Sequence, residues 1–275
     1  MRRSTLLERS VRYACLATLA VFILFPVYYM IVTSLKSQRE VFRNPGLWIS
    51  EPTLANYAEL VRSGFPRSLL NSFVVAGGAT VVSLVVGVLA AYSLVCLRYR
   101  LRGTIRNALI LAYLTPSALL FIPMAIIMSN LRQADTLHGL MLVYLSFTTP
   151  LATWLLMGFF SSLPPELEEQ ARVDGATRIQ ALYLVLIPLV RPGLVAVGII
   201  TFTSGWNEFL YALVLNLSPE AYTVPIAISH LISGDVYRWG EIMAGSVIAS
   251  VPIMVLYYLG QRSVVDGLST GAVKG

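Results

Sequence analysis

The chain has 275 residues, of which 56% are hydrophobic and only 12% are charged, and its mean hydropathy is +0.72. A soluble domain carries about 25% charged residues, so this composition excludes an ordinary cytosolic enzyme, a disordered chain and a secreted disulfide scaffold. The net charge of +6 does not indicate nucleic acid, because 18 of the 20 basic residues are arginines, mostly clustered beside apolar stretches. We therefore predict an all-α integral membrane protein that binds no nucleic acid.

Stretches without charged residues define six candidate membrane spans. A helix needs about 20 apolar residues to cross a bilayer, and five uncharged intervals reach that length. A sixth, after Arg191, is interrupted by Glu208. Backbone polar groups in lipid must be satisfied within the segment, which favours helices. The predicted helices cover residues 13–34, 70–96, 107–129, 139–161, 189–214 and 242–261, within a single transmembrane domain at 1–275.

The basic residues predict the orientation of these spans. With the N-terminus in the cytoplasm, the inside segments hold 13 arginines and lysines and the outside segments hold 7. Because basic residues are enriched in cytoplasmic loops, we expect both termini in the cytoplasm. The first uncharged run is longer than the apolar region of a signal peptide, so we expect a retained span. We expect kinks at the prolines inside the spans, which are Pro26, Pro116, Pro123, Pro150 and Pro252.

The loop between the fourth and fifth spans, residues 162–188, has a helical pattern. Pro165 suits a first helical position, and the three glutamates after it complement the helix dipole. We expect Gly175 to end this helix in the left-handed conformation. A second helix, with apolar residues at i, i+3, i+4 and i+7 from Ile179, is expected to end at Pro188. By local pattern alone, a solvated connecting loop explains this segment equally well.

The same loop carries a motif. Glu169-Gln170-Ala171, then Gly175, then Val185-Leu186-Ile187-Pro188 resembles the Glu-Ala-Ala…Gly…Ile-x-Leu-Pro signature of ABC importer permeases. The chain departs from that signature mildly, at Gln170 and at the two apolar positions before the proline. Further stretches that resemble the carbohydrate branch are 174–176, 192–193, 69–76, 206–209 and the C-terminal segment 267–275. The chain is identified as a member of the maltose-type, binding-protein-dependent family of carbohydrate ABC importer permeases.

This resemblance implies a permease subunit of an ATP-driven sugar importer in the bacterial cytoplasmic membrane. The implied partners are a homologous permease completing a heterodimeric channel, a homodimeric ABC ATPase, an extracytoplasmic sugar-binding protein, the sugar and membrane lipid. The residues implied in ATPase coupling are Glu169, Ala171, Arg172, Asp174 and Gly175. The residues implied in a C-terminal ATPase contact are Gly271, Ala272, Val273 and Lys274.

The chain itself lacks a phosphate-binding loop. Such a loop needs Gly-x-x-x-x-Gly-Lys-Ser/Thr, and neither Lys36 nor Lys274 has that context. We therefore expect no catalytic, cofactor or metal site in this chain. ATP and Mg would be bound by the partner ATPase subunits.

Glu208 is the only charged residue well inside a predicted span, and such residues usually mark functional sites. With Trp206 and Asn207 it is expected either to line the sugar path or to lie at the interface with the partner permease. We favour the interface, because a two-subunit channel need not divide its sugar site evenly.

The outside loop 217–241 resembles the one that meets the sugar-binding protein. Its Tyr222, Tyr237 and Trp239 are expected to be either contacts with that protein or interfacial anchors.

An ion-coupled secondary transporter is the alternative function. It would need intramembrane carboxylates or histidines for coupling to an ion gradient. The chain offers few such groups: Glu208 inside a span and His138 at a span end. An intramembrane enzyme is disfavoured, because no Ser/His/Asp, His-x-x-x-His or paired-Asp arrangement lies in the spans. Maltose, trehalose, other oligosaccharides, amino sugars and glycerol phosphate esters remain candidate substrates.

Overall fold

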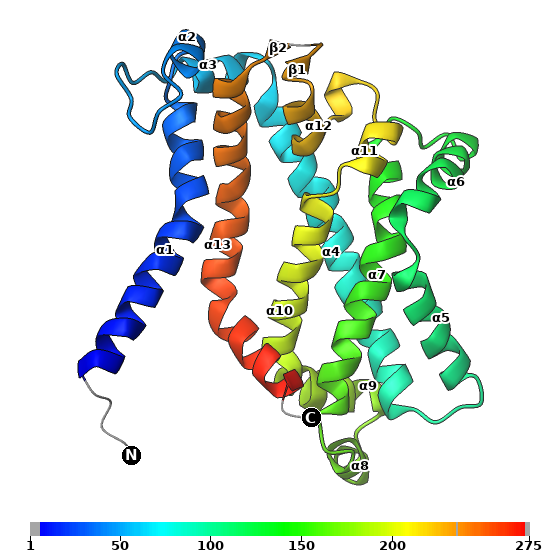
Figure 1. The fold of residues 1–275 in the computed structure, drawn as a ribbon. Coiled ribbons are helices and arrows are strands. Elements are labelled where there is room, and N and C mark those ends of the chain that lie inside the picture. The colour runs from blue at the N-terminus through cyan, green and yellow to red at the C-terminus, as the bar shows by residue number, and fades with distance from the viewer. Residues whose placement is uncertain (1–5, 235, 273–275) are drawn as a thin grey trace. The chain divides into compact units, whose positions relative to one another are not determined.

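The computed structural model describes residues 6–234 and 236–272, and these are almost entirely helical (Figure 1). The predicted all-α class is confirmed, since the described strands are a single antiparallel pair, β1 (Ile232–Ser233) and β2 (Val236–Tyr237). Five described helices are long and apolar enough to cross a membrane, or six if one bent pair is counted as a span. The five are α1 (Leu6–Ser34), α4 (Phe65–Cys96), α7 (Leu137–Ser161), the run Arg178–Trp206, and α13 (Trp239–Ala272).

The helix expected at 107–129 is divided in two. Helices α5 (Arg102–Leu114) and α6 (Ser117–Asn130) meet at a bend of 100°. Thr115 has an extended backbone, with φ −68° and ψ 122°, because the ring of a following proline disfavours the helical conformation. Pro116 thus breaks this span, whereas Pro123 lies inside α6 without ending it.

The fifth span also differs from expectation at both ends. Helix α9 (Arg178–Ala181), a π-helical turn η1 (Leu182–Leu186) and α10 (Ile187–Trp206) form one continuous run, so the helix end predicted at Pro188 is wrong. A proline lacks the backbone N–H and crowds the carbonyl of the preceding turn. We attribute the continuity to the wider π turn before Pro188, in which the Ile187 N–H bonds to the Leu182 carbonyl.

The chain divides into two compact units. Residues 1–66 and 228–251 form the first unit, and residues 67–227 and 252–275 form the second. Besides α1 and the strand pair, the first unit contains α2 (Gln38–Arg43) and α3 (Ala55–Arg62). The second unit also contains α8 (Glu166–Val173), α11 (Leu210–Leu215) and the 3₁₀ turn η2 (Pro219–Ala221). Helices α4, α12 (Val224–Ser229) and α13 cross the boundary between the units.

A buried lysine organises the loop after α1 in the first unit. Lys36 is only 2% exposed, and its Nζ donates to the carbonyl oxygens of Asn44 at 3.0 Å and Gly46 at 2.5 Å. The Asn56 side chain donates to the carbonyl oxygens of Ser34 and Lys36, both at 2.8 Å. Because buried polar groups must be hydrogen-bonded, these contacts fix the loop against α3.

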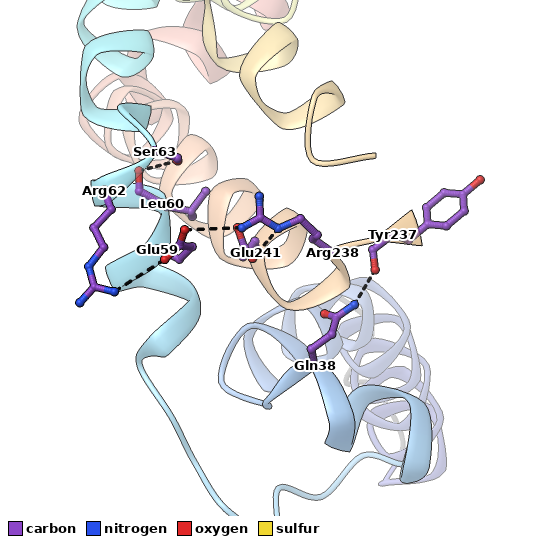
Figure 2. A network of polar contacts seen from close by, with 8 residues as sticks. All are labelled: Gln38, Glu59, Leu60, Arg62, Ser63, Tyr237, Arg238 and Glu241. Carbon is purple, nitrogen blue, oxygen red and sulfur yellow. Dashed lines mark hydrogen bonds and ion pairs between the residues drawn. The ribbon is translucent and has the colours of Figure 1, made fainter. Parts of the chain in front are cut away.

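Polar side chains also join α2 and α3 to the segment that leads into α13 (Figure 2). Nη2 of Arg238 lies 2.7 Å from Oε2 of Glu241 and 3.7 Å from Oε1 of Glu59. The Gln38 side chain donates to the Tyr237 carbonyl oxygen at 2.6 Å. Partly exposed ion pairs of this kind are worth about 0–1 kcal/mol each, so they align the two segments more than they stabilise them.

The second unit has two hydrophobic clusters along its helices. One contains Val75 of α4, Tyr144 of α7 and Tyr211 of α11. The other contains Phe160 near the end of α7 and Leu186 of the π turn, together with residues of α4 and α10. Because the second cluster includes the π turn, it fixes the helix run Arg178–Trp206 beside the segment that carries α8.

Candidate functional site

Helix α8 begins at Glu166, so Pro165 is its N-cap residue and not the first helical residue as predicted. Its first turn contains Glu166, Glu168 and Glu169. Carboxylates are favourable near the positive end of a helix dipole. The negative first turn therefore stabilises a helix of only eight residues.

The end of α8 confirms the predicted role of Gly175. This residue has φ +91°, in the left-handed region. The Gly175 N–H bonds to the Arg172 carbonyl at 3.1 Å, and the Ala176 N–H bonds to the Ala171 carbonyl at 3.0 Å. Together these bonds form a Schellman motif. A Cβ built on Gly175 would have no heavy atom within 4 Å, so the requirement for glycine comes from the backbone conformation alone.

Helix α9 begins with a capping box that the sequence analysis missed. The Thr177 side chain accepts from the Gln180 N–H at 3.3 Å, and the Gln180 side chain accepts from the Thr177 N–H at 2.8 Å. The signal was available as Thr-x-x-Gln spacing. Because α8 ends at a left-handed glycine and α9 starts at this cap, a short fixed turn connects the two helices.

Contacts with the membrane helices hold α8 in place. Ala171 is buried at 8% exposure, and Leu167 packs against the cluster that contains Phe160. The Tyr92 hydroxyl, on α4, donates to Oε1 of Glu168 at 2.8 Å. Tyr92 is not among the predicted residues, since 76 residues separate it from Glu168 and no local pattern connects them.

Other residues of this segment are exposed. Of the five predicted coupling residues, Glu169, Arg172, Asp174 and Gly175 are exposed, whereas Ala171 packs inward. Two large apolar side chains lie exposed in the same segment: Val173 at 87% and Ile179 at 68%. These two side chains are not covered by the described part of the chain.

Glu208 lies in a break between two helices. Helix α10 ends at Trp206 and α11 starts at Leu210, so the helix predicted to continue to residue 214 is interrupted. The Glu208 carboxylate accepts from the backbone N–H groups of Tyr211 at 2.8 Å and Ala212 at 3.1 Å. Since the first N–H groups of a helix have no partner within it, Glu208 serves as a cap for α11.

The neighbours of Glu208 have different surroundings. Trp206 is 2% exposed, and its ring centroid lies 4.8 Å from that of Phe73 and 5.4 Å from that of Phe202. This ring is therefore enclosed by the chain's own aromatic side chains. Asn207 is exposed at the end of α10.

The other predicted residues lie near the ends of elements. Gly271 and Ala272 end α13, whereas Val273 and Lys274 lie outside the described residues. In the loop expected to face outward, Tyr237 and Trp239 stack with centroids 5.3 Å apart. Within the second unit, the Tyr222 hydroxyl donates to the Leu217 carbonyl at 3.2 Å.

Comparisons with known proteins identify a family and relatives of this chain. Residues 83–269 match the family described as binding-protein-dependent transport system inner membrane component. A sulfoquinovosyl glycerol transport system permease of Agrobacterium fabrum is 36% identical over 270 residues, covering 97% of this chain and 94% of that protein. A trehalose transport system permease of Mycobacterium tuberculosis is 36% identical over 272 residues, which cover 98% of this chain and 99% of that protein.

A solved structure has a similar fold. A chain of a bacterial ABC transporter involved in the import of the acidic polysaccharide alginate aligns with a TM-score of 0.77 at 22% sequence identity. The alignment covers 95% of this chain and 99% of that chain. A second structure of a bacterial alginate ABC transporter, in complex with a pentasaccharide-bound periplasmic protein, aligns with a TM-score of 0.67 at 16% identity.

Proposed function

This chain belongs to the family of binding-protein-dependent transport system inner membrane components, and on that premise we propose that it is a permease subunit of an ATP-driven sugar importer. Its relatives transport sulfoquinovosyl glycerol and trehalose by name, which supports a sugar or sugar conjugate as substrate. We infer that the chain forms half of a channel completed by a homologous permease. The protein crosses the membrane several times, as the apolar helices require.

The energy source in this proposal lies in another polypeptide. The chain has no phosphate-binding loop, so ATP and Mg would be bound by two copies of a partner ATPase. By the distribution of arginine and lysine, both termini and α8 face the cytoplasm. An extracytoplasmic protein would deliver the sugar at the other side, as the periplasmic partner of the alginate transporter suggests.

We propose that α8 and α9 form the coupling element that meets the ATPase. The observation that carries this proposal is the contrast between the fixed and the exposed residues of the segment. The segment is fixed to the protein through Ala171 and the Tyr92–Glu168 hydrogen bond. At the end of α8, Val173, Asp174 and Gly175 are exposed and free to meet a partner.

The continuous run from α9 to α10 supplies the mechanical connection. Because Arg178–Trp206 is helical throughout, a displacement of α9 acts on a membrane span without an intervening loop. We expect this helix run to bend most easily at the π turn Leu182–Leu186, since such turns interrupt the regular i→i+4 hydrogen bonds. The hydrogen bond to Tyr92 would transmit movement of α8 to α4 as well.

Affinity purification tests this function. A tagged chain isolated from membranes of its own host should carry an ATPase, and reconstituted vesicles should accumulate sugar when supplied with binding protein and ATP. Trehalose is the first probe. Uptake that follows a proton or sodium gradient without ATP would identify a secondary transporter instead.

A further inference from the structure

A cavity of about 540 Å³ lies in the second unit, where the ends of α4 and α7 meet α8, α9 and the π turn. Its lining includes a set of apolar side chains: Val95, Leu97, Phe160, Leu163 and Leu186. A volume of this size is in the range of small-molecule sites. The apolar lining indicates a ligand with a hydrocarbon part.

Four arginines line the same cavity from separate segments. They are Arg98 and Arg102 after α4, Arg172 on α8, and Arg178 on α9. In the part of the chain that the structure describes, none of these four arginines forms an ion pair with a carboxylate. Arg102 donates to the Leu97 carbonyl at 3.4 Å, which leaves its charge unbalanced.

Two carboxylates also line the cavity, Glu168 and Glu169. Oε1 of Glu168 accepts a hydrogen bond from the Tyr92 hydroxyl, so this carboxylate oxygen already has a partner in the protein. Four guanidinium groups against two carboxylates leave an excess of positive charge in the cavity. An anion is therefore the complementary ligand.

We propose that this cavity binds a phosphate group, carried by an anionic phospholipid whose acyl chain covers the apolar lining. Guanidinium groups bind phosphate oxygens in a bidentate fork. The cavity lies at the ends of two membrane spans, where lipid headgroups are found, and basic pockets between such helices suit anionic headgroups. A soluble phosphate ester would satisfy the arginines but would leave the apolar lining uncovered.

Bound lipid would connect four segments of the chain. The arginines belong to the loop after α4, to the first residue of α5, to α8 and to α9. A shared phosphate between them would restrict the movement of α8 and α9 relative to the membrane helices. This inference rests on the membrane location of the chain and not on import of a sugar.

Lipid titration tests the proposal. The purified full-length chain in dodecyl maltoside is titrated with fluorescent phosphatidylglycerol, with phosphatidylcholine as the zwitterionic comparison. The double variant Arg98→Gln/Arg178→Gln removes charge from two walls; both side chains are exposed and lack side-chain hydrogen bonds in the described structure. We expect it to weaken binding of phosphatidylglycerol about tenfold or more.

The matched control is Arg106→Gln/Arg191→Gln, two exposed arginines on the same expected side of the membrane but outside the cavity. It should change the affinity by no more than about twofold. An equal loss in both double variants, or equal binding of the two lipids, would overturn the proposal, since either result indicates general surface charge.

A competition arm distinguishes the two sources of phosphate. Glycerol 3-phosphate should displace the labelled lipid only weakly, and Leu163→Asn in the apolar lining should weaken lipid binding without affecting glycerol 3-phosphate. Glycerol 3-phosphate that binds as tightly as the lipid would contradict the lipid assignment and identify a site for soluble phosphate esters. Thermal melting of each variant confirms that it is folded.

Discussion

The Tyr92 hydroxyl donates a hydrogen bond of 2.8 Å to the Glu168 carboxylate and thereby joins α4 to α8. Tyr92 is 6% exposed and its ring lies against Phe160, with centroids 6.5 Å apart. This pair connects the exposed segment with the interior of the second unit. If α8 receives movement from a partner, Tyr92 is one route by which it reaches α4.

Removing this hydroxyl should loosen α8. Tyr92→Phe keeps the ring and deletes one hydrogen bond, so we expect a loss of about 1 kcal/mol and a melting temperature lower by roughly 2–4 °C. Thermal unfolding in detergent measures the change. Tyr113→Phe is the control, because the Tyr113 ring also stacks, on Trp154, but its hydroxyl forms no hydrogen bond in the described structure. Equal shifts in the two variants would assign the effect to the rings.

The backbone of Gly175 predicts an ordered series of substitutions. At φ +91°, alanine should cost about 1–2 kcal/mol and asparagine less, since asparagine tolerates the left-handed region. Nothing lies within 4 Å of the new Cβ, so crowding does not contribute.

Gly103→Ala is the matched control for Gly175→Ala. Gly103 also has open space around a new Cβ but lies in helix α5, where alanine is the better residue. Chemical denaturation should show destabilisation at Gly175 and none at Gly103. Equal stability of Gly175→Ala and wild type would contradict the strained-cap interpretation.

Glu208 should act on the stability of α11. Glu208→Ala leaves the N–H groups of Tyr211 and Ala212 without their acceptor, which should cost about 1–2 kcal/mol. Transport by the assembled complex should fall along with this stability. Glu208→Gln keeps one acceptor oxygen and should lose less.

Exposed Glu220, which has no side-chain hydrogen bond in the described structure, provides the control variant Glu220→Ala. Melting temperature and the KM for sugar uptake are measured together. A Glu208→Ala complex with unchanged stability and a raised KM would place Glu208 in the sugar path.

Asp135 should make stability depend on pH. Its carboxylate accepts hydrogen bonds from the Leu217 N–H at 2.8 Å, from the Ser218 N–H at 2.9 Å and from the Ser218 hydroxyl. The bonds from Ser218 lower the pKa of Asp135 below its usual 3.8. A lowered folded-state pKa gives stability that is present above the unfolded pKa and is lost as pH falls through the folded pKa.

Asp135→Asn tests this linkage. The variant should melt at a lower temperature than wild type at pH 7, and the difference should shrink as the pH falls below about 4. Asp174→Asn, at an exposed carboxylate without a side-chain hydrogen bond in the described structure, should melt like wild type at pH 7. A constant difference between Asp135→Asn and wild type from pH 7 to pH 3 would contradict the role of the charge.

Some features could be predicted from sequence because their causes are local. The left-handed end of α8 follows from a glycine after a helical pattern, and the spans follow from long uncharged runs. The break at Thr115–Pro116 was expected only as a kink, since Pro26 and Pro123 lie inside helices that continue. Which proline breaks a span depends on its surroundings, and sequence periodicity does not encode them.

Contacts between distant segments could not be predicted in this way. Tyr92 and Glu168 come together only when α4 packs beside the coupling segment. The sequence predicts Glu208 as a charge inside a span. Its hydrogen-bond partners are backbone N–H groups of α11, and the break between α10 and α11 that exposes them is not visible in the sequence pattern. The packing of Trp206 against Phe73 of α4 is likewise a contact between distant segments that no local pattern predicts.

In the proposed mechanism, α8 and α9 transmit the movement of an ATPase to the membrane helices. Val173→Asp is the variant to measure, because Val173 is 87% exposed and its replacement should not affect folding. Leu131→Asp, at a 58% exposed residue after α6, is the control. ATP hydrolysis and sugar uptake are measured on the same reconstituted complexes. We predict that Val173→Asp loses ATPase binding or takes up less sugar for each ATP hydrolysed, while Leu131→Asp behaves as wild type. A Val173→Asp complex that assembles, hydrolyses and transports at wild-type rates would contradict the account.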